Sequence, residues 1–206
     1  GDLELFGPVA ADGASQITYY HTGVGTHDGV DRVVGGAFGE GLVTNILDCY
    51  RFLVNNYVPG DELYFFGFSR GALYAVNYAL TYPEHVGKLY LDAPVMDIRS
   101  WPGGLGIGAG TPDCWKECKE IYGLTDETAR TFDKNPLDRA EELAKLNIPV
   151  ILVAGGDDKT VPLCENGELF AVRFRKAGGQ LRMIVKPDCD HHPHSLEDPA
   201  PVVEFL

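Results

Sequence analysis

Residues 62–72 read ELYFFGFSRGA, and the predicted fold depends on this stretch more than on any other. After Glu62, residues 63–68 are apolar or aromatic, so residues 62–68 are expected to form a buried strand. Apolar side chains then recur at helical spacing from Ala72 to Leu80, and Pro83 ends that helix near Tyr82. The stretch therefore predicts a strand, a sharp turn and a helix in direct succession.

The turn itself is Gly67-Phe68-Ser69-Arg70-Gly71, a G-x-S-x-G pattern. At a strand-to-helix turn this pattern exposes a strained serine as a nucleophile. The glycines let neighbouring backbone approach, and the start of the helix offers N–H groups where an oxyanion would form. Ser69 is therefore the candidate nucleophile, with the backbone N–H of Arg70 as a candidate oxyanion donor.

Strands and helices alternate on both sides of this turn, and the rhythm breaks only over residues 95–134. The expected strands are 15–21, 62–68, 88–92, 149–154 and 181–186, and the expected helices include 41–57, 135–147 and 165–177. This alternation predicts an α/β fold, a doubly wound and mostly parallel sheet of about five strands. We expect one domain over residues 1–206, with a flap or insert at about 95–134.

Two further loops follow predicted strands and carry the other groups that a serine nucleophile needs. The first reads GGDDKTVP over residues 155–162, and the second reads DCDHHPH over residues 188–194. Because the carboxyl ends of parallel strands meet at one edge, these loops should lie near Ser69. Serine, then acid, then histidine is the chain order of an elbow-type Ser-His-Asp triad.

Net charge argues against several partner classes. Seventeen basic and thirty acidic residues among 206 give a formal charge of -13, which disfavours nucleic acid and anionic membranes as partners. The longest apolar stretches are too short to span a bilayer. The start, Gly1 to Glu4, lacks the regions of a signal peptide, so a soluble cytoplasmic protein is favoured. A secreted form whose signal peptide has been removed also fits a chain that begins without Met.

The cysteines and histidines leave two alternatives open. Five cysteines fit no zinc-finger spacing, and reduced thiols are favoured, although a disulfide between Cys164 and Cys189 would tie the acid loop to the histidine loop. The DCDHHPH run contains metal-binding residue types, but only His21, His27 and Asp28 offer a second group. We therefore expect no metal and no cofactor.

Taken together, these motifs resemble the α/β-hydrolase superfamily over essentially the whole chain. Residues 18–75, with TYYHTGVGT, GGAFGEGL and PGDELYFFGFSRGA, resemble the hydrolase domain of bacterial phospholipase effectors. From about residue 80 onward, LDAPV, SWPGG and HHPHS look more like bacterial esterases of the acetyl-esterase and prolyl-oligopeptidase-like kind.

The resemblance implies roles for individual residues. The acid loop matches the superfamily at Asp158 better than at Asp157, and His191 is favoured over His192 and His194. Asp190 occupies the place of the glycine that usually precedes this histidine. The second oxyanion donor would be Gly23 or Val24. The expected substrate contacts are Thr22, Phe68 and Trp101, and Trp101 fits equally well as a side chain that packs the flap down.

These features predict a serine esterase that forms an acyl-enzyme on a small-molecule ester, with short acyl chains favoured. Alternatives are a lipase or phospholipase, or a peptidase, on the same triad. An alternative from a different functional class is a binding domain that has the hydrolase fold but no catalytic activity. It is suggested by Asp190, which stands where the superfamily usually has a glycine.

Overall fold

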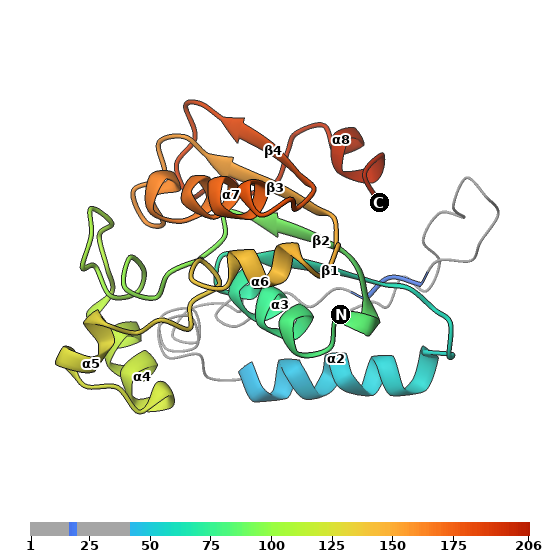
Figure 1. The fold of residues 1–206 in the computed structure, drawn as a ribbon, viewed down its shortest axis with the longest axis horizontal. Helices are drawn as coiled ribbons and strands as arrows, with labels where there is room; N and C mark the ends of the chain where they lie inside the picture. Colours follow the sequence, from blue (N-terminus) through green and yellow to red (C-terminus); the bar gives the residue numbers. More distant parts are fainter. Residues whose placement is uncertain (1–16, 20–41) are drawn as a thin grey trace, which may run out of the picture. The chain divides into compact units, whose positions relative to one another are not determined.

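A parallel sheet lies at the centre of the fold (Figure 1). The computed structural model describes residues 17–19 and 42–206. Within these ranges the sheet has four strands in the order β1-β2-β3-β4, and every neighbouring pair is parallel. The strands are β1 (Leu63–Phe68), β2 (Val86–Asp92), β3 (Val150–Gly155) and β4 (Leu181–Lys186). The predicted α/β class and the parallel sheet are thereby confirmed.

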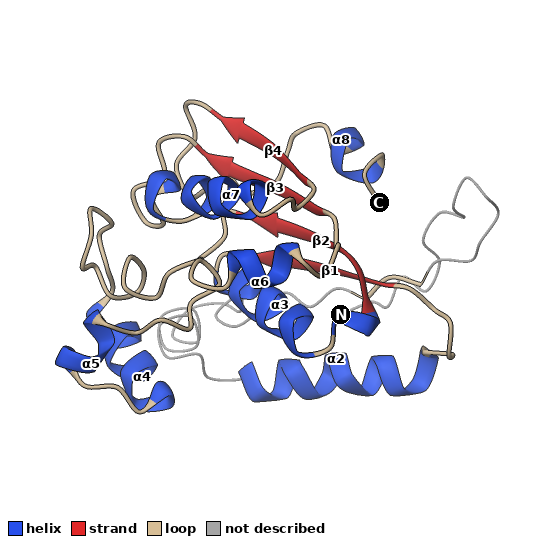
Figure 2. Cartoon of the chain, viewed as in Figure 1, coloured by secondary structure: helices blue, strands red, loops and turns tan. Residues whose placement is uncertain are grey.

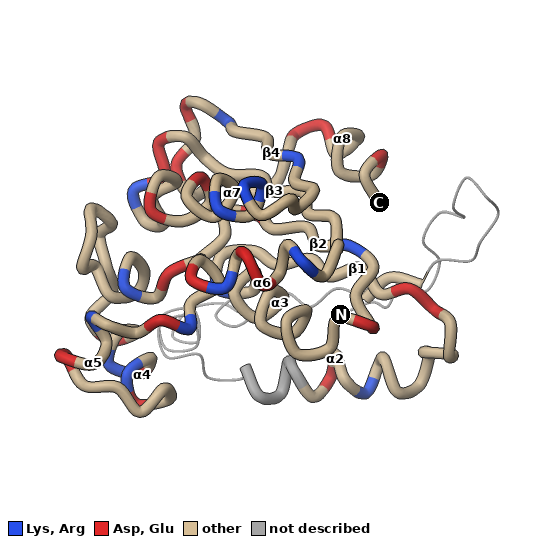
Figure 3. Tube along the Cα trace, in the orientation of Figure 1, with Lys and Arg blue, Asp and Glu red and all other residues tan. Residues whose placement is uncertain are grey.

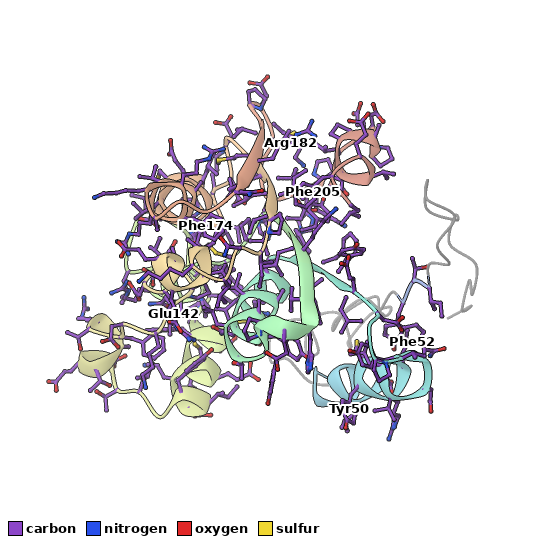
Figure 4. All side chains as sticks on the ribbon, turned by 45° about the vertical axis from the view of Figure 1, so that its right-hand side comes forward. Tyr50, Phe52, Glu142, Phe174, Arg182 and Phe205 are labelled. Carbon is purple, nitrogen blue, oxygen red and sulfur yellow. The ribbon has the colours of Figure 1, made fainter. Side chains whose placement is uncertain are left out.

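The amino-terminal part of the chain forms a separate unit. The chain divides into two compact units, residues 1–61 and 62–206. In the first unit, α2 (Leu42–Asn56) agrees closely with the helix predicted over 41–57. The strand expected over 15–21 is described only at 17–19, where the backbone is in neither a helix nor a strand. Tyr19 there stacks on Phe52 of α2, with ring centroids 4.7 Å apart (Figure 4 labels Phe52). The expectation of a single domain stays a prediction.

Helices connect the strands of the second unit, and one further helix, α8, follows the last strand (Figure 2). They are α3 (Arg70–Thr81), α4 (Pro112–Tyr122), α5 (Asp126–Arg130), α6 (Ala140–Ala144), α7 (Gly167–Lys176) and α8 (Ala200–Val203), with short 3-10 turns at Pro83–His85 and Leu163–Glu165. The helix predicted over 135–147 is much shorter than expected and begins only at Ala140. Asn135 does not cap this helix. Its carbonyl accepts the N–H groups of Asp138 and Arg139 in the turn that precedes the helix, while its Oδ1 accepts the Ile98 N–H at 3.0 Å.

The two faces of the sheet are covered by different elements. Leu89 and Leu91 of β2 pack with buried side chains of α3, α6 and α7, including the fully buried Phe170 and Phe174. Tyr90, between those leucines, points to the opposite face, where α8 and the carboxyl terminus cover it. This alternation follows from the two-residue repeat of a strand. At β3 both faces are buried, which explains why this strand is apolar throughout. At β1 they are not: Phe66 is 57% exposed, so the strand predicted to be buried over 62–68 is only partly covered.

The register of the strands sets the position of the site. Phe68 is paired with Asp92, and Asp92 with Val153, so these strands end at one edge of the sheet. Gly155 at the end of β3 is paired with Lys186 at the end of β4. The loops that follow all four strands therefore begin at the same edge.

Candidate active site

Ser69 lies in a strained turn between β1 and α3. Its backbone angles, φ 52° and ψ -115°, are in a region that residues other than glycine rarely adopt. Gly67 is required here, because a Cβ at this position would lie 2.5 Å from the backbone N of Ala72. Gly71 differs from the expectation: apart from its chain neighbours and the nearby backbone of its own helix, no described atom lies within 4 Å of a Cβ added there. The Ser69 N–H donates to the Asp92 carbonyl at 2.9 Å, which ties the turn to the end of β2.

Asp158 is the buried acid of the loop after β3. Its Oδ1 accepts the backbone N–H groups of Thr160 at 2.9 Å and Val161 at 2.7 Å. These two bonds fix the carboxylate and leave Oδ2 free to face the histidine loop. Asp157 is exposed, and its backbone N–H donates to the Cys189 carbonyl at 3.0 Å. The structure therefore distinguishes two aspartates that are adjacent in sequence.

His191 lies between the serine and the buried acid. Its Nδ1 is 2.7 Å from Asp158 Oδ2, and its Nε2 is 3.1 Å from Ser69 Oγ. The His191 side chain is 10% exposed and that of Asp158 is 1% exposed, so water competes little for either contact. A proton on Nδ1, held by Asp158, leaves Nε2 as an acceptor for the serine hydroxyl. Three residues from three separate loops thus form one hydrogen-bonded chain.

Asp190 joins the acid loop to the histidine loop, a role that the sequence did not reveal. Its Oδ1 accepts the N–H of Lys159 at 3.0 Å and the N–H of His191 at 2.8 Å. These two bonds lower the pKa of Asp190 below its ordinary value. The same loop also passes close to the end of β3, where a Cβ on Gly155 would lie 2.3 Å from the Cys189 carbonyl oxygen. An aspartate in the place of a glycine thus supports the histidine loop.

Phe68 and the three histidine rings form an aromatic cluster beside the serine. The Phe68 ring centroid lies 5.1 Å from His191, 5.5 Å from His192 and 4.5 Å from His194. Burial, followed by the neighbouring His191 and His194, lowers the pKa of His192. In the structure the ring contacts of Phe68 are therefore with the histidine loop. Of the three histidines, His191 makes the contact with Ser69.

Trp101 packs inside the second unit, on the loop that leads from β2 to α4. Its ring lies against the cluster formed by Leu73, Val95 and neighbouring apolar side chains, and the Arg70 guanidinium lies 5.8 Å from the ring centroid. The main chain of this loop is held by side chains of other segments. Asn166 Oδ1 accepts the N–H groups of Met96 and Asp97, and Glu165 Oε1 accepts that of Ile107. The predicted insert over 95–134 thus consists of this tethered loop together with α4 and α5.

Several sequence predictions fall on residues outside the described ranges. Thr22, Gly23 and Val24 lie there, as do His21, His27 and Asp28. The second oxyanion donor therefore stays a prediction. Within the described ranges, no group of three or more histidine, cysteine or acidic side chains gathers as metal ligands would.

The cysteines and helices bear on two further expectations. All five cysteines are free, so the disulfide considered between Cys164 and Cys189 is not formed. Cys164 is exposed in the 3-10 turn after the acid loop, whereas the Cys189 backbone packs against Gly155 and Asp157. Among the helices of the described residues, none is long and apolar enough to cross a bilayer.

Asp92 is a second buried carboxylate at this edge, at the end of β2. Its Oδ2 accepts the Ser195 N–H at 2.7 Å, while Oδ1 is buried without a hydrogen-bond partner in the described part of the chain. Burial raises the pKa of Asp92, against the opposing effects of the Ser195 N–H and the nearby His194 and Lys186 charges. A raised pKa in the folded state means that folding favours the protonated form. The contribution of Asp92 to the free energy of unfolding is therefore greatest at acidic pH and is lost as the pH rises through the pKa of the folded state.

We therefore expect Asp92→Asn to increase the free energy of unfolding near neutral pH. The amide oxygen can still accept the Ser195 N–H, and the buried charge is removed. The gain should shrink as the pH falls, because the wild-type carboxyl also becomes neutral. Urea unfolding followed from neutral to acidic pH measures this. Asp190→Asn is the matched control with the opposite sign, because the folded structure lowers the pKa of Asp190. This variant should be less stable than the wild type at neutral pH, and the difference should shrink in acid. Equal effects of both variants across this range would contradict the argument.

Comparison with known proteins gives likenesses that divide along the chain. Residues 3–91 match the family described as T6SS, Phospholipase effector Tle1-like, catalytic domain. An uncharacterized protein of Saccharomyces cerevisiae is 37% identical over an alignment of 79 residues, and the match covers 31% of this chain and 11% of that protein. Each of these matches covers less than half of the chain.

Solved structures match a larger share of the chain. Pyrococcus horikoshii acylaminoacyl peptidase has a TM-score of 0.53 and 19% identity, over 72% of this chain and 23% of its own. Porphyromonas gingivalis dipeptidyl peptidase 4 has a TM-score of 0.51 and 16% identity, over 85% of this chain and 21% of its own. The chain thus spans less than a quarter of the length of these structures. The sheet, the strained turn and these likenesses together show that the chain has the α/β-hydrolase fold.

Proposed function

We propose that this chain is a serine hydrolase that cleaves carboxylic esters through an acyl-enzyme. One observation carries the proposal: Ser69 Oγ is 3.1 Å from His191 Nε2, and His191 Nδ1 is 2.7 Å from Asp158 Oδ2. This is the arrangement of nucleophile, base and orienting acid that acyl transfer requires. The match to a phospholipase effector family and the fold shared with two peptidases support a hydrolase.

Acylation would begin with the Ser69 hydroxyl. His191 Nε2 takes the hydroxyl proton as Ser69 Oγ forms a bond to the ester carbonyl carbon, and the carbonyl oxygen becomes an oxyanion. Asp158 holds the Nδ1 proton and stabilises the imidazolium that results. The tetrahedral intermediate then expels the alcohol, which takes the proton from His191 Nε2. Ser69 remains acylated.

Deacylation would repeat the same proton movements with water. His191 Nε2 takes a proton from a water molecule whose oxygen attacks the acyl carbon, and the proton then passes to Ser69 Oγ as the carboxylic acid leaves. We propose the backbone N–H of Arg70, in the first turn of α3, as the first donor to the oxyanion, because the residue after the nucleophile lies at the start of this helix. Gly23 or Val24 would supply the second donor. No step draws on a cofactor.

The acyl chain of the substrate is the finer part of this proposal. Short-chain esters are favoured, with Phe68 and Trp101 beside the serine turn as candidate contacts. A phospholipase is the second candidate, and the family match over residues 3–91 is the observation that favours it. A comparison of p-nitrophenyl acetate, p-nitrophenyl octanoate and a phosphatidylcholine separates them. A short-chain esterase should prefer the acetate, whereas the phospholipase reading requires release of fatty acid from the phospholipid.

The central test is covalent labelling with a fluorophosphonate probe. Trypsin cleavage after Arg51 and Arg70 gives peptide 52–70, whose only serine is Ser69. We expect the probe to modify this peptide and to abolish ester turnover at the same rate. Turnover that is lost to a chelator, without labelling, would replace the proposal with a metal-dependent hydrolase. A folded protein with neither labelling nor turnover would replace it with a binding domain.

A further inference from the structure

A second site lies apart from Ser69, in a cavity of about 440 Å³ next to α7. Neither Ser69 nor His191 is among the residues that line it. Its polar lining consists of three arginines, two acidic residues, a serine and a cysteine: Asp97, Arg99, Ser100, Arg130, Cys164, Glu165 and Arg173. Its volume is in the range of small-molecule sites. We refer to it as the arginine cavity.

The three guanidinium groups come from three different segments. Arg99 lies in the loop after β2, Arg130 is the last residue of α5, and Arg173 lies in the last turn of α7. Figure 3 shows the basic positions on α7. The Arg173 side chain is 42% exposed and that of Arg99 is 29% exposed, so both reach the cavity from partly covered positions. Convergence of three segments on one cavity is typical of a binding site and not of a single charged helix.

The acidic groups around the cavity already have hydrogen-bond donors. Both oxygens of Asp97 are bound by the Arg99 side chain, at 2.7 to 3.0 Å. Glu165 accepts from Ser100 Oγ and from the Ile107 N–H, each at 2.7 Å. Asp138, outside the lining, accepts the backbone and side-chain N–H groups of Asn135, and its Oδ1 also lies 3.6 Å from Arg99 Nη2 and 3.7 Å from Arg173 Nη1. Among the described residues, no carboxylate forms an ion pair with Arg130.

The guanidinium groups, in contrast, retain unused donors. An arginine has five N–H donors, of which Arg99 uses Nε and Nη2 on Asp97. Arg173 donates from Nη1 to the Leu137 carbonyl at 3.1 Å. Arg130 makes no hydrogen bond or ion pair with any residue that the structure describes. The guanidinium groups of the cavity therefore keep unused N–H donors. The lining carries three positive and two negative charges, and the adjacent Asp138 adds a third negative charge.

We propose that the arginine cavity binds a small molecule carrying a phosphate or carboxylate group. Such oxyanions accept from guanidinium N–H groups in the fork geometry that arginine favours. The leucines of the lining, Leu105, Leu137 and Leu169, would contact the carbon part of the same molecule. The ligand would carry its anion at Arg130 and at the Nε and Nη2 groups of Arg173, because Arg99 already faces Asp97 and Arg173 Nη1 already contacts Asp138 and the Leu137 carbonyl. This site is independent of the esterase proposal.

Cys164 offers a direct measurement, because it is exposed and lines the cavity. Trypsin releases it in peptide 160–173, whose only cysteine is Cys164. Its alkylation by a maleimide can be followed in this peptide with inorganic phosphate, glycerol 3-phosphate, succinate or sodium chloride at matched ionic strength. We expect one of the oxyanions to slow alkylation and chloride to have no effect. The anion that slows the alkylation of Cys164 most shows whether the cavity prefers a phosphate or a carboxylate group.

Variants assign the protection to the guanidinium groups. Loss of one charged hydrogen bond weakens binding by about tenfold or more, so Arg130→Gln and Arg173→Gln should each need at least that much more anion. Arg175→Gln is the matched control on α7, because Arg175 bonds to the Leu181 carbonyl and does not line the cavity. It should bind like the wild type. No protection by any oxyanion, or equal loss in all three variants, would overturn the proposal. Thermal unfolding of each variant confirms that it is folded.

Discussion

Replacing Ser69 with alanine is expected to lower kcat for p-nitrophenyl acetate by roughly 10⁵-fold to 10⁶-fold, as for loss of the nucleophile in a triad. The reason is that His191 Nε2 would lose the hydroxyl that lies 3.1 Å away, and no acyl-enzyme could form. Fluorophosphonate labelling of peptide 52–70 should disappear in the same variant. The fold should be retained, because alanine keeps the Ser69 N–H bond to the Asp92 carbonyl.

Ser195→Ala is the matched control for this experiment. Ser195 lies in the loop that carries His191, but its Oγ faces the Tyr90 hydroxyl at 3.3 Å, and its bond to Asp92 comes from the backbone. We expect turnover within about tenfold of the wild type, since no group of the proposed triad is removed. Equal activity of Ser69→Ala and the wild type would rule out Ser69 as the nucleophile.

The edge of the sheet that carries the candidate site could be predicted because it depends on strand direction. Ser69, Asp158 and His191 each lie in a loop after a parallel strand, and parallel strands bring such loops together whatever their separation in sequence. The apolar β3 and the glycine at position 67 were equally informative. Here local sequence and global topology require the same arrangement, so the sequence was sufficient.

The supporting contacts could not be predicted, because they join backbone to distant side chains. Asp190 accepts the Lys159 N–H across two loops, and Asn135 serves the Ile98 N–H and not its own helix. Neither contact follows a repeating pattern in the sequence from which it could be predicted. The arginine cavity is a similar case, since Arg99, Arg130 and Arg173 come together only through packing. The sequence indicated the candidate residues of the site, and only the tertiary structure shows which other groups hold them in place.

His191→Ala is expected to lower kcat by roughly 10⁵-fold to 10⁶-fold, close to the effect of losing Ser69, because base and nucleophile act as a unit. Steady-state turnover of p-nitrophenyl acetate measures it. Combining the variant with Ser69→Ala should add little further loss, since either change alone prevents acylation. A double variant much worse than both would mean that the two side chains act independently.

His192→Ala and His194→Ala separate the base from its neighbours. All three rings contact Phe68, with centroids between 4.5 and 5.5 Å from it, so each variant disturbs the same aromatic cluster. Of the three histidines, only His191 is also hydrogen-bonded to Ser69 and Asp158 in the described part of the chain. A packing effect should therefore appear in all three variants and stay within about tenfold. A loss of several orders of magnitude should appear in His191→Ala alone, and the same loss in His194→Ala would move the role of base to that residue.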